Sequence, residues 1–385
     1  MMESNKKILI ATGAYPPEIG GPASYSKTLA LKLINSTVLT YSSALKLEDD
    51  KSRPYKVVRV WKRLPKGWRH LAYFFKALSL AKKNDVVFAL NAVSAGIPAM
   101  YAAKMAKKKF FVKIVGDAAW ERAINDSKTS FLINDFQKTK KSGFIGMLHK
   151  FQRRVCLNAD KVIVPSKYLA DIVHGWGIPR EKIAIVYNGT DFKPSELSKE
   201  EARIKIGIHG NIVLSAGRLV PWKGFRMLIK MMPRLLELKQ FARLVIVGDG
   251  PDKKTLEAMI KNTRMDQKIF LVGKKSKDEL AAYLAAADIF VLNSGYEGFS
   301  HQILESMACG VPVIASATGG NKEAITQGEN GFLVKYNDEF NLVEAIKTVW
   351  QDEELKDELI KNGKKTIERF SVEKMYEETL NILNS

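Results

Sequence analysis

Short apolar runs alternate along the chain with longer segments in which apolar residues recur at helical spacing. The runs are four to six residues long, and most of them end in glycine-rich or polar loops. Runs of this length indicate buried parallel strands, and the segments between them indicate crossover helices. The pattern therefore predicts an α/β protein built from doubly wound, Rossmann-like sheets. The expected strands lie at residues 7–12, 37–40, 56–61, 85–90, 110–115, 160–165, 182–187, 212–216, 243–247, 268–272, 288–292, 312–315 and 331–334.

The alternation of strands and helices starts again after a polar stretch, KPSELSKEEAR, at residues 193–203. A chain of 385 residues is long enough for two domains of ordinary size. We therefore expect an N-terminal domain at residues 1–193 and a C-terminal domain at residues 194–370, both Rossmann-like, that face a cleft. In such sheets, ligands bind in the loops that follow the carboxyl ends of the strands.

The net charge of +20 is concentrated in the first half of the chain. Residues 1–200 contain 35 Lys and Arg against 16 Asp and Glu, whereas residues 201–385 contain 26 against 25. A basic domain joined to a neutral one suggests that the first domain faces an anionic partner. Nucleic acid, a phospholipid surface and a phosphorylated acceptor are the candidates. No nucleic-acid-binding module is recognisable, so a basic nucleic-acid-binding protein is the remote alternative and no nucleic-acid partner is expected.

Residues 59–83 combine basic side chains with Trp, Tyr and Phe. This composition is typical of a helix that lies on an anionic membrane surface, and equally of a core-facing helix with a solvated basic side. Residues 122–143 show no regular pattern and are expected to be irregular. The N-terminus lacks the long apolar stretch of a signal peptide. We expect a cytoplasmic protein, peripheral on the inner face of the plasma membrane if residues 59–83 bind lipid.

The stretch LNSGYEGFSHQILE at residues 292–305 carries two carboxylates after an expected strand. Glu297 lies in a glycine-flanked turn, and Glu305 lies one turn into the helix that follows. Carboxylates suit sugar and ribose hydroxyls. The residues that open the helix are Phe299, Ser300 and His301, whose amides would form an anion site. The alternative is a surface turn with two solvated glutamates.

Other expected strand ends carry cations, glycines or an acid. Arg218 and Lys223 follow the strand at residues 212–216, where two cations suit a diphosphate or are simply solvated. Gly20 and Gly21 precede a helix, which indicates close approach to a ligand. Asp117 follows the strand at residues 110–115, as a site acid or as a turn cap. Without a Walker A loop, an Asp-x-Asp pair or a Cys/His cluster, we expect no metal and no cofactor.

These residues fall within stretches that resemble the retaining glycosyltransferases of family 4, which have the GT-B fold. The resemblance covers nearly the whole chain and is most specific in the second half. The matching stretches are Tyr15-Pro16-Pro17 to Gly21, ADKVIVPSKYLADIV (159–173), VYNGTDF (186–192), SAGRLVPWKGF (215–225), LVIVGDGP (244–251), AAADIFVLNSGYEGFSHQILESMACGVPVIASATGG (285–320) with Glu323, and NGFLV (330–334).

The resemblance implies a function and a role for each site residue. Arg218 and Lys223 would bind the donor diphosphate, Glu305 the ribose hydroxyls and Glu297 the donor sugar. The amides of residues 299–301 would bind the distal phosphate, and Gly20 and Gly21 would close over phosphates or acceptor. The last helix, at about residues 371–385, would return to the first domain. Relatives often carry a histidine near the position of Asp117, so Asp117 would replace it as a catalytic or sugar-binding acid.

The expected activity is retaining, metal-independent transfer of a sugar from a nucleotide diphosphate sugar to an acceptor hydroxyl. The basic first domain fits an acceptor at the membrane, such as a lipid-linked or cell-envelope glycan precursor. A nucleotide-sugar epimerase and a soluble glucan synthase are alternatives within the same fold.

Overall fold

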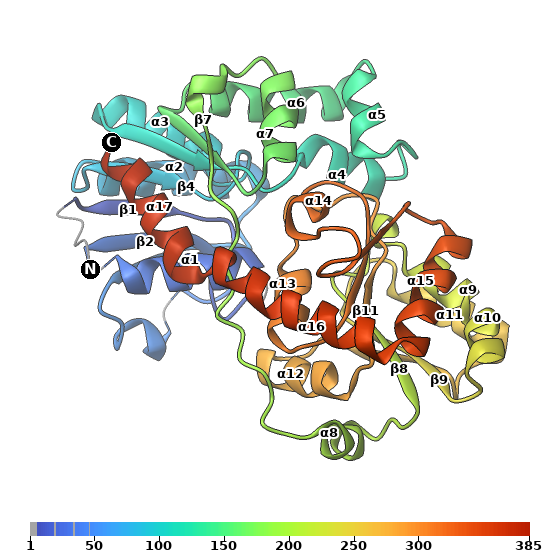
Figure 1. The fold of residues 1–385 in the computed structure, drawn as a ribbon. Coiled ribbons are helices and arrows are strands. Elements are labelled where there is room, and N and C mark those ends of the chain that lie inside the picture. The colour runs from blue at the N-terminus through green and yellow to red at the C-terminus, as the bar shows by residue number, and fades with distance from the viewer. Residues whose placement is uncertain (1–5, 19–20, 34, 46) are drawn as a thin grey trace. The chain divides into compact units, whose positions relative to one another are not determined.

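The computed structural model describes residues 6–18, 21–33, 35–45 and 47–385. The chain divides into two compact units (Figure 1). Unit 1 comprises Met1–Val186 and Glu373–Ser385, and unit 2 comprises Tyr187–Val372. The sequence-based boundaries were placed at 193/194 and at about 370/371. The C-terminal residues therefore belong to the unit that contains the start of the chain.

Unit 1 is built on a parallel sheet of seven strands in its described residues, in the order β3-β2-β1-β4-β5-β6-β7. Strand β1 pairs on one side with β2, where Ile8 faces Ser36, and on the other with β4, where Ile8 faces Val86. The strand order therefore reverses between β1 and β4. The strands are β1 (Ile8–Ala11), β2 (Ser36–Ser42), β3 (Lys56–Trp61), β4 (Val86–Ala89), β5 (Lys109–Lys113), β6 (Lys161–Val164) and β7 (Ile183–Ile185).

Helices cover both faces of the unit 1 sheet, as the near-continuous apolar strands require. The C-terminal helix lies beside the first one, with the rings of Tyr25 and Tyr376 6.4 Å apart (Figure 1). The Nζ of Lys6 donates to the carbonyl of Asn384 at 2.6 Å, which ties the chain end to this unit. The helices are α1 (Gly21–Lys32), α2 (Lys66–Ala81), α3 (Gly96–Ala106), α4 (Ala118–Asn125), α5 (Ile133–Lys138), α6 (Gly143–Leu157), α7 (Lys167–Gly175) and α17 (Val372–Asn384).

Unit 2 repeats this architecture with a parallel sheet of six strands in its described residues, in the order β10-β9-β8-β11-β12-β13. The first strand β8 pairs with β9 on one side and with β11 on the other, where Val213 faces Ile289. The strand order therefore reverses between β8 and β11. The strands are β8 (Asn211–Ala216), β9 (Ala242–Val247), β10 (Ile269–Gly273), β11 (Ile289–Leu292), β12 (Val313–Ser316) and β13 (Phe332–Val334).

Some helices of unit 2, among them α8 and α12, begin at serine or aspartate side chains that cap the first turn. α8 and α12 start with capping boxes, in which Ser198 pairs with Glu201 and Ser276 with Glu279. The helices are α8 (Lys199–Ile206), α9 (Phe225–Lys230), α10 (Met232–Leu238), α11 (Lys253–Thr263), α12 (Lys277–Ala286), α13 (His301–Ala308), α14 (Asn321–Ala324), α15 (Glu339–Gln351) and α16 (Glu353–Ile367).

The predicted strands are confirmed to within a few residues, but two predicted segments differ. Residues 122–143 are only partly irregular, because α4 extends to Asn125 and α5 spans Ile133–Lys138, whereas residues 126–132 and 139–142 lie outside helices and strands. Residues 59–83 are not one segment, since residues 59–61 belong to β3 and the helix begins at Lys66. In the part of the chain that the structure describes, no helix has both the length and the apolar character needed to cross a membrane.

Candidate functional site

The point where the strand order reverses in unit 2 brings most of the predicted site residues to one edge of the sheet. Strands β8 and β11 are neighbours, and their carboxyl ends open into the loops at residues 217–224 and 293–300. The two loops turn toward opposite faces because their helices cover opposite faces of the sheet. Such a switch point leaves a crevice that binds ligands in doubly wound folds.

Backbone and amide hydrogen bonds fix the two loops to each other. The amide of Gly295 donates to the carbonyl of Trp222 at 2.7 Å, and Nδ2 of Asn293 donates to the carbonyl of Gly224 at 3.2 Å. Gly224 has a φ of 64°, and a Cβ there would collide with Asn293. A glycine is therefore required at this contact, and the loops are rigid supports for their side chains.

Lys223 and Glu297, predicted separately as site residues, form an ion pair between the two loops. The Nζ of Lys223 lies 2.5 Å from Oε1 of Glu297, and the two side chains are only 11% and 10% exposed. The carbonyl of Glu297 also accepts from the amide of Gly320 at 3.0 Å. The carboxylate and the ammonium are thus held in a fixed, mostly desolvated position at the carboxyl end of the sheet.

Arg218 differs from Lys223 although it lies in the same loop. Its side chain is exposed, and no hydrogen bond or ion pair joins its guanidinium to the described part of the chain. An unpaired guanidinium beside a fixed ammonium can bind a phosphate group without first breaking a contact. The loop therefore offers one cation that is already engaged and one that is available.

Helix α13 begins at the same edge of the sheet, two residues after the predicted opening at Phe299. Ser300 is the N-cap, and its hydroxyl makes no capping hydrogen bond to the first turn, unlike the serines that cap α8 and α12. His301 is the first helical residue. The start of α13 carries the positive end of the helix dipole, and the Ser300 side chain does not cap it. An anion binds favourably at such a helix start.

The prediction that Phe299 opens the helix is wrong, because this residue precedes the N-cap. Its ring is buried against Tyr187 and Phe370, with centroids 5.1 and 5.0 Å away. Its carbonyl accepts from Nδ2 of Asn188 at 3.0 Å. Phe299 therefore fixes the start of α13, the predicted anion site, through packing.

Glu305 lies within α13, in a position where its carboxyl group is poorly solvated. Burial raises the pKa of this carboxyl to about 7, the ammonium of Lys277 opposes the rise, and the carboxylate of Asp191 adds to it. Lys277 and Asp191 are themselves 3.3 Å apart. Glu305 therefore exchanges its proton near neutral pH and can accept hydrogen bonds from hydroxyl groups when it is ionised.

Asp117 lies in unit 1 and caps helix α4. Its Oδ1 accepts from the amides of Ala119 and Trp120 at 2.9 and 3.1 Å and from Nε2 of Gln152 at 2.8 Å. Its Oδ2 accepts from Nε2 of Gln137 at 2.8 Å, and the residue is fully buried. In the structure this carboxylate caps the N-terminus of α4. Its catalytic or sugar-binding role remains a prediction.

The two glycines predicted for the first domain belong to the loop after β1. Gly20 lies outside the described residues, and Gly21 is the first residue of α1. Strand β1 adjoins β4 at the reversal point of the unit 1 sheet, so Gly21 starts a helix at the switch point of its own unit. Its contact with phosphates or acceptor remains a prediction.

Polar residues at the carboxyl ends of β11 and β12 were not predicted as site residues, although their hydrogen bonds connect the two strand ends. Ser316 Oγ receives the amide of Ser294 at 2.9 Å, and Thr318 Oγ1 donates to the carbonyl of Ser294 at 2.7 Å. Ser294 Oγ and Asn321 Oδ1 are buried without a hydrogen-bond partner in the described residues. Asn293 and Ser294 directly follow an apolar strand, and this position is the sequence signal from which they could have been predicted.

Within the described ranges, no three His, Cys, Asp or Glu residues gather into a metal-binding group.

The fold is that of a protein with two Rossmann-like units, and most of the predicted site residues lie at the switch point of the second unit. Residues 19–193 match the family model described as Glycosyltransferase Family 4, and residues 198–366 match Glycosyl transferases group 1. The two matches together cover most of both units. The chain therefore belongs to the family 4, group 1 glycosyltransferases, which confirms the resemblance.

Two curated relatives show how far the similarity extends. The N-acetylgalactosamine-N,N'-diacetylbacillosaminyl-diphospho-undecaprenol 4-alpha-N-acetylgalactosaminyltransferase of Campylobacter jejuni is 30% identical over 62% of this chain and 65% of its own length. This chain also matches other curated relatives over about three-fifths of their length. The GDP-mannose-dependent monoacylated alpha-(1-6)-phosphatidylinositol monomannoside mannosyltransferase of Corynebacterium glutamicum is 26% identical over 100% of this chain and 99% of its own.

Solved structures share the fold of the whole chain. The crystal structure of Anabaena HepE in complex with UDP and glucose has a TM-score of 0.81 at 21% identity, and the match covers 99% of this chain and 100% of that one. The predicted GT-B fold is confirmed by this likeness.

Proposed function

We propose that this protein transfers a sugar from a nucleotide diphosphate sugar to a hydroxyl group of an acceptor, with retention of the anomeric configuration and without a metal ion. The observation that carries the proposal is the fixed Lys223–Glu297 pair at the switch point of unit 2, with the unpaired Arg218 in the same loop. Two cations and a helix start suit a diphosphate, and the carboxylates suit hydroxyl groups of a sugar and a ribose.

The proposed donor site assigns one task to each residue. Arg218 and Lys223 bind the diphosphate and stabilise the negative charge that develops as it leaves. The start of α13 binds the distal phosphate, and Glu305 accepts hydrogen bonds from the ribose hydroxyls. Glu297, held by Lys223, accepts from a hydroxyl of the donor sugar. Because protein cations stabilise the leaving group, no metal ion is needed for this step.

Transfer breaks the bond between the anomeric carbon and the diphosphate oxygen and forms a bond from that carbon to the acceptor oxygen. In the proposed mechanism, the acceptor hydroxyl attacks from the face that the diphosphate leaves, so configuration is retained. The departing phosphate oxygen takes the proton of the acceptor hydroxyl. This step needs no strong protein base, which agrees with the capping task of Asp117.

The acceptor is proposed to be a lipid-linked or cell-envelope glycan precursor at the inner face of the plasma membrane. The basic character of residues 1–200 supports an anionic acceptor or surface. The names of two relatives give lipid-linked acceptors: a diphospho-undecaprenol and a phosphatidylinositol monomannoside. A nucleotide sugar as donor is supported by the UDP in the HepE structure and by the GDP-mannose in the name of the second relative.

The test is the thermal stability of the protein against a panel of nucleoside diphosphates and nucleotide sugars in metal-free buffer. One base should raise the melting temperature, because a ligand that binds only the folded state stabilises it. Glu305→Ala and Arg218→Ala should lose that rise. Lys230→Ala is a matched control, since it removes an exposed cation of α9. No rise with any nucleotide would contradict the proposed donor site.

The reaction itself is tested with the donor that this panel identifies. Radiolabelled sugar should move to a lipid extract that contains the acceptor, and the anomeric configuration of the product should equal that of the donor. Conversion of the donor without any acceptor would contradict transfer and indicate an epimerase. An inverted product would contradict the retaining mechanism while leaving the donor site intact.

A further inference from the structure

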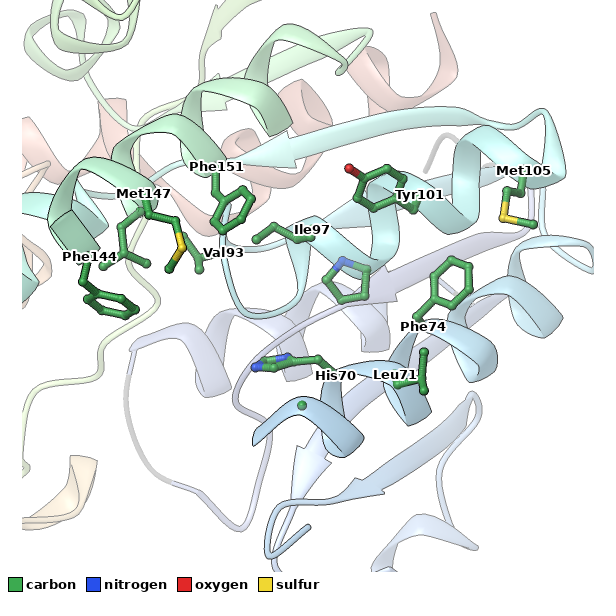
Figure 2. A pocket seen from close by; sticks show the side chains of 13 residues that line it. His70, Leu71, Phe74, Val93, Ile97, Tyr101, Met105, Phe144, Met147 and Phe151 are labelled. Carbon is green, nitrogen blue, oxygen red and sulfur yellow. The ribbon is translucent and has the colours of Figure 1, made fainter. Parts of the chain in front are cut away.

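Three helices of unit 1 each direct an apolar stripe at a common pocket. The pocket has a volume of about 680 Å³, which lies in the range of small-molecule sites. The stripes recur at helical spacing on α2, α3 and α6 (Figure 2). Their members are Gly67, His70, Leu71 and Phe74 on α2, Ile97, Pro98, Tyr101 and Met105 on α3, and Phe144, Met147, Leu148 and Phe151 on α6.

The pocket is open to solvent, and its rim exposes large apolar side chains. The exposed fractions are 63% for Met105, 48% for Phe144, 44% for Leu71 and 42% for Met147. Single exposed apolar residues are ordinary on protein surfaces, but a contiguous set around a hollow marks a site for an apolar partner. These four side chains come from all three helices, so the patch is continuous with the interior of the pocket.

The lining offers almost nothing to a polar ligand. Nδ1 of His70 is 2.8 Å from the hydroxyl of Tyr41, and that hydroxyl donates to the carbonyl of Ser94 at 3.0 Å. Burial, together with the charge of Arg69, lowers the pKa of His70, which favours the neutral form of the ring. A hydrocarbon chain fits such walls better than a sugar or a nucleotide does.

The three helices that line this apolar pocket are basic. Helices α2, α3 and α6 contain three, one and three Lys or Arg residues and no Asp or Glu. The Cζ of Arg154 lies 5.5 Å from the centroid of Tyr101, a lining residue. Arg154 is exposed, and no ion pair joins it to the described residues. An unpaired guanidinium at the rim suits an anionic headgroup whose chain enters the pocket.

We propose that this pocket binds one hydrocarbon chain of an anionic membrane lipid, with the headgroup at Arg154 and the neighbouring exposed Lys104 and Lys150. The three-helix pocket thereby anchors unit 1 to the membrane by insertion of a chain, in addition to electrostatic attraction. This inference goes beyond the proposed sugar transfer, because it requires no donor and no acceptor. The proposed site includes α2, from the segment at residues 59–83 for which a membrane-surface helix and a core-facing helix were both predicted, and it adds α3 and α6.

A second copy of this chain is the competing occupant, and charge argues against it. Two copies that met through this face would bring together two surfaces that are rich in Lys and Arg and contain no acid on the three helices. Such a contact is opposed by repulsion between like charges. An anionic lipid surface is attracted by the same charges.

The experiment is flotation of the full-length protein with vesicles of phosphatidylcholine alone or with added phosphatidylglycerol. The wild type should float with the anionic vesicles. Leu71→Asp/Met147→Asp should reduce the bound fraction about tenfold or more, because two apolar contacts are lost and two negative charges are added. The matched control is Ile204→Asp/Phe241→Asp, which makes the same changes at exposed apolar residues of unit 2 and should float like the wild type.

Chain insertion is tested separately with cis-parinaric acid, a fluorescent fatty acid. Its fluorescence should rise on mixing with the wild type, saturate near one molecule per protein, and fall on addition of lysophosphatidylglycerol. The variant Leu71→Asp/Met147→Asp should lose this signal and the control pair should keep it. Absence of the signal in the wild type, or equal flotation of both double variants, would overturn the proposal. A wild-type dimer that only Leu71→Asp/Met147→Asp dissociates would identify a second copy as the occupant.

The same preparations report on the two proposals independently. The thermal shift with nucleotide should be unchanged in Leu71→Asp/Met147→Asp, because no donor-site residue is altered. A nucleotide shift without vesicle binding would leave the donor site standing and reject the lipid site. Vesicle binding without a nucleotide shift would reject the donor site and leave the lipid site standing.

Discussion

The Nζ of Lys223 and Oε1 of Glu297 lie 2.5 Å apart, although 73 residues separate them in the chain. The two side chains leave adjacent strand ends and are both nearly buried. A desolvated ion pair at a ligand site does two things at once. It orients each group, and it ensures that each charge is neutralised until a ligand offers new partners.

Substitution of Lys223 should harm both stability and activity. In Lys223→Ala the Glu297 carboxylate loses its partner while remaining mostly desolvated, which should lower the free energy of unfolding by about 1–3 kcal/mol. The rate of transfer should fall on the order of 10²-fold or more, as when a donor to a developing oxyanion is removed. Chemical denaturation and initial-rate kinetics measure the two effects.

Arg218 provides the comparison for Lys223, because it has the same proposed ligand and no ion pair in the described residues. Arg218→Ala should reduce the rate by a similar factor while changing the free energy of unfolding by less than about 0.5 kcal/mol. A large loss of stability in Arg218→Ala would show that its side chain has a structural partner. An unchanged rate in both variants would remove the diphosphate role from this loop.

Glu305 should make folding stability depend on pH near neutrality. Its pKa is raised to about 7 in the folded protein, above the value of an unfolded glutamate. Between pH 4.5 and 7 the folded state therefore binds more protons than the unfolded state, and stability falls as pH rises through this window. Glu305→Gln should remove this fall, which is worth about 3 kcal/mol at most.

The measurement is urea denaturation of the wild type and Glu305→Gln at pH 5 and pH 8. The free energy of unfolding of Glu305→Gln, relative to that of the wild type, should be larger at pH 8 than at pH 5. Glu237→Gln is a suitable control, since this glutamate is exposed on α10. If Glu305→Gln and Glu237→Gln follow the same pH dependence, Glu305 is not the responsible group.

Donor affinity in the wild type should rise over the same range, because the ionised carboxylate is the better acceptor for ribose hydroxyls.

Asp117→Ala should destabilise unit 1 by about 2–4 kcal/mol. The variant loses the cap of α4, worth about 1 kcal/mol, and leaves the buried amide groups of Gln137 and Gln152 without their acceptor. Asp117→Asn should not restore full stability. Its amide nitrogen would face Gln137 Nε2, and Gln137 cannot turn over because its Oε1 accepts from Trp176 Nε1 at 3.0 Å.

Kinetics well below the melting temperature separate capping from catalysis. If Asp117 only caps α4, folded Asp117→Ala should transfer sugar at nearly the wild-type rate with unchanged donor affinity. A loss on the order of 10²-fold in folded enzyme would instead support the catalytic or sugar-binding role predicted from the resemblance.

Lys113 should destabilise the protein at neutral and acidic pH. It is only 2% exposed in β5, and its Nζ has no hydrogen-bond partner in the described residues and lies 3.8 Å from the centroid of Tyr25. Burial lowers its pKa to about 7. The unfolded state therefore binds more protons between pH 7 and 10.5, and stability should rise with pH across this window.

Lys113→Met keeps the length of the side chain and removes the charge. It should raise the free energy of unfolding at pH 6 by about 2–4 kcal/mol and flatten the rise at alkaline pH. Lys56→Met, at an exposed position of β3, is the control and should change neither quantity. A destabilised Lys113→Met at pH 6 would show that the ammonium has a favourable role in the folded protein.

Removal of divalent metal ions should leave transfer unchanged. The proposed leaving-group stabilisation comes from Arg218, Lys223 and the start of α13, so a chelator removes nothing that the reaction uses. Initial rates with and without EDTA test this expectation, and a full dependence on added Mg²⁺ or Mn²⁺ would contradict it. A metal-dependent glycosyltransferase of known mechanism in the same buffers shows that the chelator is effective.

The sequence by itself determined the α/β class and the order of strands and helices. Each parallel strand is a short apolar run, so strands such as residues 8–11 and 289–292 are predictable from the local sequence. The strand ends that carry Gly, Arg, Lys and Glu were also visible, because ligand loops follow the strands directly in this architecture. Arg218, Lys223, Glu297 and Glu305 were therefore predicted as site residues from their positions after the strands.

Only the tertiary structure decided which of these groups meet and which are desolvated. The Lys223–Glu297 pair depends on β8 and β11 becoming neighbours, which is a property of strand order. The burial of the Asp117 carboxylate needs Gln137 and Gln152 from later helices as its partners, and the low pKa of Lys113 needs its burial beside Tyr25. The apolar pocket exists because three distant helical stripes face one space. Electrostatics and burial depend on contacts between distant residues, and a linear pattern does not contain those contacts.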